Sequence, residues 1–337
     1  VMGTAVLAVV MAGNPGGVDP LRPVLEGLAV VFLVVATLLA AVLLLAYGAR
    51  WTSHRDAALA DLRNPIPGPL IGSVPGGLLV LAAAFSAAGP LLLPDALARG
   101  IATALVVVAA PLALVVGVVW AAEVVDNAPI PLERITGTWF LPPVIAVLVP
   151  LAAAPLIPSW PAPELWLALG YAFAGAGMIL YGIVAVLVVA RLAMRGPPPP
   201  PMAPAVWIAL GPPGAGGIAL LRLADAAEAT GVLAGEALLV TTVTLATLLM
   251  GFALWWLAFA ALVLRRQLRR GPVPTTPARW AGTAPRGAHP ARPPARARLG
   301  DSPGVTVLGL VRLAATLGVW ALVATRTVQA VRSGTAW

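Results

Sequence analysis

Unbroken apolar runs are the feature that most limits what this chain can fold into. Residues 24–49 form such a run, with Glu26 as their one charged residue. An α-helix needs about 20 apolar residues to cross a bilayer core about 30 Å thick. Strands of a membrane barrel would alternate apolar and polar residues over about ten positions, whereas residues 30–35 are apolar throughout. The runs therefore predict transmembrane helices and exclude a barrel.

The composition agrees with many such helices in one chain. Of 337 residues, 60% are hydrophobic and 10% are charged, whereas soluble domains carry about 25% charge. We predict an all-α polytopic membrane protein with room for about eight to ten spans. None of the 21 basic residues is Lys, and Ala, Gly, Pro and Val dominate, which we interpret as a GC-rich genome and a bacterial plasma membrane location. The formal charge of +8 is concentrated in loops, as the positive-inside rule expects, so no nucleic-acid partner is predicted.

Nine spans can be read directly from the sequence. They cover approximately residues 1–12, 24–49, 70–89, 98–122, 138–156, 165–190, 205–223, 233–264 and 305–324. The first run has neither the basic segment nor the cleavage site of a signal peptide, and a start upstream of it is left open. Residues 265–303 are too rich in Arg and Pro to span a bilayer. Three regions result: spans one to eight in 1–264, a basic segment in 265–303, and the last span with its tail in 304–337.

Proline distinguishes the odd-numbered spans from the even-numbered ones. The third, fifth and seventh spans contain the motifs Pro75-Gly76-Gly77, Pro142-Pro143 and Gly211-Pro212-Pro213-Gly214. Proline bends a helix and frees a carbonyl, which a bilayer tolerates where protein or water satisfies the backbone. We therefore expect the odd spans to form an inner, kinked set. Pro111 lies in the fourth span, and Pro is common in membrane helices generally. The alternative that these prolines have no role in an inner set is therefore left open.

Arginine indicates the orientation of the chain. Ten arginines lie at the far ends of even-numbered spans and three in the opposite loops, so we expect even spans to end in the cytoplasm, where the N-terminus also lies. The ten are Arg50, Arg55, Arg63, Arg134, Arg191, Arg195, Arg265, Arg266, Arg269 and Arg270, and the three are Arg22, Arg99 and Arg222.

The spans offer little to an enzyme. The chain has no cysteine, and its two histidines, His54 and His289, lie outside the apolar runs, so neither metal nor cofactor binding is predicted. No HExxH or GxSxG motif and no aspartate pair on a helix face occurs. We interpret the remaining ionisable residues, such as Glu164 and Arg222, as residues at the ends of spans whose side chains extend to the membrane interface. A path of kinked backbone and small residues favours a channel or transporter over an enzyme.

Five short segments, in span order, resemble the tellurite-resistance/dicarboxylate transporter family. This family includes bacterial tellurite-resistance proteins, yeast malate permeases, fungal sulfite exporters and plant slow anion channels. The segments are VMGTA at 1–5, DLRNP at 61–65, GTWFLP at 137–142, GPPGAG at 211–216 and LWW at 254–256. The resemblance covers nearly the whole chain, and its motifs lie mainly on odd spans.

The resemblance implies ten helices arranged as five hairpins around a central pore, in a homotrimer surrounded by lipid. The odd, kinked spans would line the pore and pass small inorganic or organic anions. Helix ends exposed at the kinks would offer N–H groups to an anion, a weak attraction suited to conduction. The residues carried over as pore-lining are Gly3, Pro75, Gly76, Phe140, Pro142, Pro143, Pro212, Pro213, Gly214 and Gly216, with Gly214 and Gly216 keeping the bore open.

The ninth span of the family is disrupted in this chain. Where the family has a Phe-Pro-Leu-Gly pattern whose Phe plugs the pore, this chain has Pro-Arg-Gly-Ala-His-Pro at 285–290. GC-rich codons for the family pattern, read one frame off, give these residues, so we suspect a local frameshift. A restored ninth span would also return Arg326 and Arg332 to the cytoplasm. The alternative is a genuine cytoplasmic loop that binds anionic lipid.

Three functions remain open from the sequence. The first is passage of small anions or C4-dicarboxylates, such as malate, sulfite, chloride or nitrate, through the pore. The second is proton-coupled dicarboxylate exchange, for which the spans contain no buried carboxylate relay, although a protonated substrate could carry the proton. The third is a membrane scaffold that transports nothing, because the ninth span is disrupted.

Overall fold

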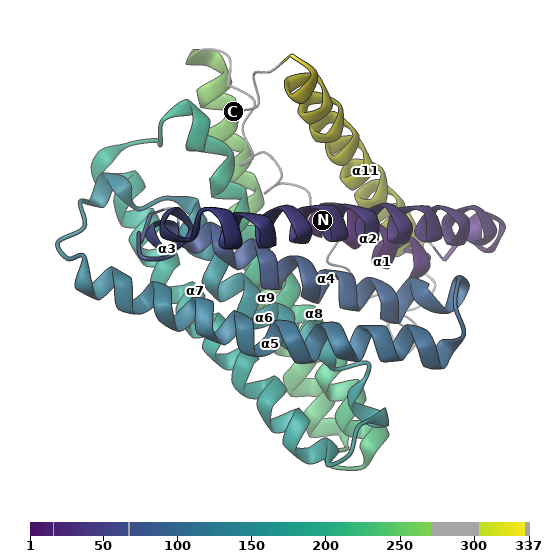
Figure 1. The fold of residues 1–337 in the computed structure, drawn as a ribbon. Helices are drawn as coiled ribbons and strands as arrows, with labels where there is room; N and C mark the ends of the chain where they lie inside the picture. Colours follow the sequence, from purple (N-terminus) through teal and green to yellow (C-terminus); the bar gives the residue numbers. More distant parts are fainter. Residues whose placement is uncertain (16, 67, 271–302, 334–337) are drawn as a thin grey trace.

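The computed structural model describes residues 1–15, 17–66, 68–270 and 303–333. Within these ranges every regular element is a helix (Figure 1), so the all-α prediction is confirmed. Seven helices are long and apolar enough to cross a membrane, and Met2–Ala12 and Gly137–Ala153 form two shorter apolar helical segments. Each of the nine predicted spans thus corresponds to a helix. The suspected frameshift at 285–290 lies outside the described residues.

Five long helices form an outer set. Each has 30 to 35 residues, well above the about 20 that a crossing needs. In the most apolar stretch of any of them, no more than 28% of the residues are buried. Such exposed apolar surface is what lipid contact requires. They are α2 (Arg22–Ser53), α5 (Asp95–Asp126), α7 (Pro163–Arg195), α9 (Glu236–Arg270) and α11 (Pro303–Arg332).

Four shorter helices form an inner set. In the spans that contain α4 and α8, 61% and 83% of the most apolar stretch is buried. The inner helices are α1 (Met2–Ala12), α4 (Ser73–Ala88), α6 (Leu141–Ala153) and α8 (Gly211–Thr230). A 3-10 helix precedes three of them: η2 (Gly68–Gly72) before α4, η5 (Gly137–Phe140) before α6 and η7 (Pro200–Leu210) before α8. Among the described residues, the prediction that odd spans lie inside is therefore confirmed for the first, third, fifth and seventh spans, whereas the ninth predicted span, α11, is an outer helix.

The packing order repeats along the chain. Inner helices contact one another in sequence, α1 with α4, α4 with α6 and α6 with α8. Each outer helix α2, α5 and α7 packs on its own inner partner and also on the next inner helix, and α9 packs on α8 and η7. The contact of α11 with α1, visible at one side of Figure 1, extends this pattern across the two ends of the chain.

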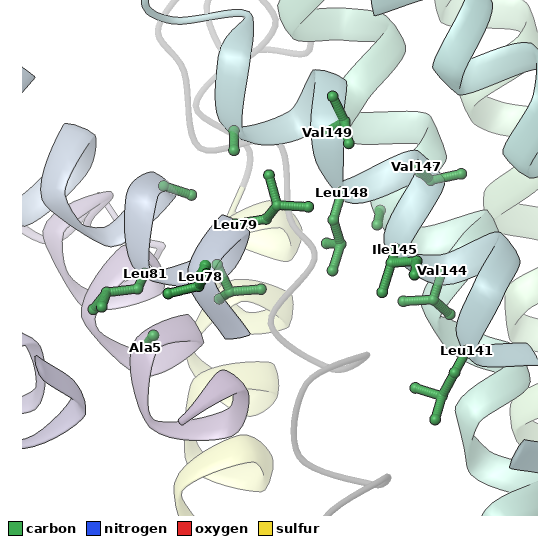
Figure 2. Packing of buried hydrophobic residues seen from close by; sticks show 14 of the residues in the cluster. Ala5, Leu78, Leu79, Leu81, Leu141, Val144, Ile145, Val147, Leu148 and Val149 are labelled. Carbon is green, nitrogen blue, oxygen red and sulfur yellow. The ribbon is translucent and has the colours of Figure 1, made fainter. Parts of the chain in front are cut away.

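Helix α6 holds the centre of this arrangement. Figure 2 shows Ile145 and Leu148 on the side of α6 that faces Leu79 of α4, with Val147 pointing the opposite way. A Cβ on Gly177 of α7 would lie 2.5 Å from Val147 Cγ2 and 3.0 Å from the Pro143 carbonyl oxygen. Only glycine permits α7 to approach α6 this closely, so the hairpin is fixed by a missing side chain as well as by apolar burial.

The connections are short helices and turns with paired charges. They include α3 (Arg55–Leu62), η1 (Asp19–Leu21), η3 (Gly89–Leu91), η4 (Leu132–Arg134) and η6 (Ile157–Ser159). Ion pairs join Arg50 to Asp61 and Arg195 to Glu133 across connections, and Arg22 to Glu26 and Arg99 to Asp95 within helices. These exposed pairs contribute little to stability, so the membrane-embedded packing dominates.

Candidate functional site

Three inner spans share one construction at the predicted kinks. In each, a 3-10 helix changes into an α-helix, and proline occupies the first turn of the α-helix. Pro75 is the third residue of α4, while Pro142-Pro143 and Pro212-Pro213 are the second and third residues of α6 and α8. Proline is favourable there because the first turn of a helix needs no N–H donor from it. The kink is thus a change of helix type, and not a bend inside one α-helix.

The expected N–H groups are missing from two of these breaks. The N–H of Leu141 donates to the Thr138 carbonyl, and the N–H of Gly211 donates to the Ile208 carbonyl. The next two residues in each helix are prolines, which have no N–H. Residues 141–143 and 211–213 therefore present no free donor to an anion, and the sequence-based idea of anion binding by helix ends is not supported at α6 and α8.

What the breaks present instead is carbonyl oxygen. Pro143 and Pro213 cannot donate to the carbonyls of Trp139 and Ala209, four residues earlier, so these lack their α-helical partner. The two 3-10 helices that carry them, η5 and η7, pack against each other. A Cβ on Gly137 would overlap the Ala205 carbonyl and lie 2.9 Å from the Val206 nitrogen. The polar backbones of the fifth and seventh spans are thus in direct contact, with no side chain between them.

Phe140 does not face the centre of the inner set. It is fully buried, with its ring 5.4 Å from that of Tyr181 on α7 and 5.8 Å from that of Trp256 on α9. The Trp256 indole N–H donates to the Val206 carbonyl of η7 over 3.0 Å. Phe140 therefore belongs to an aromatic cluster that anchors η5 and η7 to outer helices, and we do not keep it among the pore-lining candidates.

Two glycines from the predicted lining lie in different surroundings. A Cβ on Gly76 would be 3.1 Å from both Met2 of α1 and Ile145 of α6, so Gly76 lies where three inner helices meet. A Cβ on Gly216 would be 2.9 Å from Met178 of α7 and 3.6 Å from Leu249 of α9. Gly216 faces outer helices and is removed from the proposed lining. The remaining candidates, Gly3, Pro75, Pro142, Pro143, Pro212, Pro213 and Gly214, are buried on inner helices.

Side-chain donors satisfy other carbonyls that prolines leave without a partner. Arg191 of α7 donates to the Gly196 carbonyl over 2.7 Å, and Gln267 of α9 donates to the Pro198 carbonyl over 2.9 Å. Both side chains are buried, and their hydrogen bonds attach α7 and α9 to the run of five prolines at 197–201 that leads into η7. No sequence motif singles out Gln267, although the proline run indicates a shortage of N–H donors nearby.

Charge is almost absent from the inner set. Helices α1, α4 and α6, with η2 and η5, contain no charged residue, and η7 with α8 contains Arg222, Asp225 and Glu228. Arg222 is half-buried and donates to the Leu151 carbonyl of α6 over 2.9 Å. The breaks therefore lie in an uncharged interior, in which backbone carbonyls are the polar groups that prolines leave without a helical partner.

Broken inner spans are typical of channels and carriers, which move solutes along discontinuous helices. Residues 1–328 match the SLAC1 family, described as voltage-dependent anion channel, and the chain belongs to that family. This confirms the resemblance found in the sequence. Two proteins of Methanocaldococcus jannaschii, each bearing the name uncharacterized transporter, are 27% and 26% identical to this chain over 293 residues. These alignments cover 86% of this chain and 79% and 80% of the relatives.

Proposed function

We propose that the protein passes small anions or C4-dicarboxylates through a pore along α1, α4, α6 and α8. The observation that carries this is the repeated 3-10 to α-helix break in three buried inner spans, with no charged residue at any of the breaks. Irregular backbone at membrane depth must face protein or a water-filled path. Membership of the anion channel family supports an anion as the solute. The homotrimer, the lipid contacts and the bacterial plasma membrane location stay predictions.

A second candidate is a carrier for a protonated acid, and the carbonyls at the breaks favour it. The oxygens of Trp139 and Ala209 accept hydrogen bonds and donate none. A monoanionic dicarboxylic acid carries its own O–H donor, whereas chloride or nitrate carries none. Such a substrate would bring its proton with it and would require no carboxylate relay in the helices.

Reconstitution into sealed vesicles tests both candidates together. Vesicles that contain the purified protein are expected to release chloride, nitrate, sulfite or malate faster than protein-free vesicles do. A channel would accelerate flux when potassium and valinomycin impose a membrane potential, whereas a carrier of a protonated acid would acidify the receiving compartment as malate moves. Vesicles that hold folded protein yet release none of the four anions would contradict both candidates and favour a scaffold.

A further inference from the structure

Arg222 lies deeper in the inner set than its sequence position suggests. The apolar run of the seventh span ends at residue 223, but α8 continues to Thr230. At about 1.5 Å per residue, Arg222 is about 16 Å from the break at Gly211 and about 12 Å before the end of the helix. Its half-buried side chain is therefore beside the inner helices and not beyond them.

A second inner helix holds the guanidinium in place. In a continuing α-helix the Leu151 carbonyl of α6 would accept a hydrogen bond from the N–H of residue 155, but that residue is Pro155, which has no N–H. Nη1 of Arg222 supplies the missing donor over 2.9 Å. The hydrogen bond fixes the charge between the carboxyl-terminal halves of α6 and α8, two inner helices that pack against each other.

The electrostatics of this end of the inner set would otherwise repel an anion. Helices α6 and α8 direct their carboxyl ends, with partial negative charge, toward it. Asp225 and Glu228 on α8 add two carboxylates. Arg222 is the single basic residue on α1, α4, α6, α8 and the 3-10 helices η2, η5 and η7. It is therefore the one cation on these helices that could offset this negative potential.

We propose that Arg222 is a specificity-determining residue that admits anions at the mouth formed by the carboxyl ends of the inner helices. This inference rests on the proposed function. The solute it recognises is a small anion of either one or two charges, attracted by the fixed guanidinium and not coordinated tightly. From the sequence alone we interpret Arg222 as an interfacial side chain. Its hydrogen bond to α6 is the reason for assigning it to the proposed anion path.

The test measures exchange of radiolabelled chloride, and of malate in parallel, across vesicles that hold wild-type or variant protein. Arg222→Gln keeps an amide donor for the Leu151 carbonyl but removes the charge, and Arg222→Lys keeps the charge. In about 10 mM salt, where charges act over about 30 Å, Arg222→Gln should slow exchange by roughly threefold to tenfold. In about 1 M salt, with a screening length of about 3 Å, the difference should nearly vanish. Arg222→Lys should stay near wild type.

Arg99→Gln is the matched control, because Arg99 lies on outer helix α5 in an exposed ion pair with Asp95. It should exchange anions as wild type does at both salt concentrations. If Arg222→Gln matches wild type at low salt, or is slowed equally at both concentrations, the inference is wrong. If wild-type protein exchanges neither anion, the proposed function itself fails.

Discussion

Single residues decide how closely the broken spans approach one another. Gly137 lies where η5 meets the backbone of η7, and Trp256 reaches across from α9 to bond the Val206 carbonyl. Gly137 allows the close approach because it has no side chain, and Trp256 forms its hydrogen bond because its side chain is long. Both act on the same junction, so the geometry of the breaks in the fifth and seventh spans depends on residues that carry no charge.

Gly137→Ala should destabilise the protein strongly. The added methyl group would overlap the Ala205 carbonyl, and backbone cannot rotate away as a flexible side chain could. Overpacking of this kind costs about 1 to 3 kcal/mol. Gly175→Ala, on α7 with nothing near its Cβ, is the control and should be neutral or slightly stabilising. Thermal unfolding followed by tryptophan fluorescence would compare them, and equal melting temperatures would contradict the close approach.

Trp256→Phe should leave the Val206 carbonyl without its indole donor while keeping most of the aromatic packing. Trp256 is fully buried, so the unsatisfied carbonyl should lower the free energy of unfolding by about 1 to 3 kcal/mol. Trp255→Phe is the neighbouring control, since the Trp255 side chain is 55% exposed and should tolerate the change. Chemical denaturation in detergent measures both, and a loss of stability confined to Trp255→Phe would show that the anchor is misassigned.

At the scale of elements, the sequence predicted which spans lie inside but not the direction of their side chains. Runs of apolar residues located the nine helices, and Pro75, Pro142 and Pro212 indicated three of the four inner ones. The 3-10 helices were not foreseen, because periods of 3.0 and 3.6 residues are hard to separate in a fully apolar segment. Phe140 faces outward because contacts with α7 and α9 set its orientation, and no local pattern encodes them.

Pro213→Ala tests whether the break in the seventh span serves transport. The new N–H could donate to the Ala209 carbonyl and extend the α-helix backward, removing the oxygen that the break presents. Stability should hold or rise, while anion flux should fall roughly fivefold, because a straighter helix narrows the path. Pro111→Ala in outer helix α5 makes the same chemical change away from the inner set. Equal flux in both variants and wild type would remove the break from the transport path.

At the scale of the whole molecule, the repeated packing of outer helices on inner helices predicts one further inner position, between α8 and α1. Each outer helix α2, α5 and α7 packs on the next inner helix, and α11 packs on α1 in the same manner. By that rule α11 is the outer helix of a fifth hairpin, whose inner helix would stand between α8 and α1. The residues that precede α11 in the chain, 271–302, lie outside the described part of the structure.

The last prediction concerns that place and the suspected frameshift. Residues 279–298 include five arginines, and three of them at a helix centre in lipid would cost about 8 to 10 kcal/mol. From this cost we predict that the segment does not insert as a transmembrane ninth helix. A chain with residues 270–303 restored to an apolar, Phe-containing span should be more thermally stable than the printed chain and should pass anions in a gated manner. Resequencing codons 270–303 and comparing both chains for chloride flux and melting temperature would decide the matter. If resequencing gives codons for the same residues 270–303, and the unaltered chain is stable and closed to chloride, the frameshift account is wrong and the segment is a genuine cytoplasmic loop.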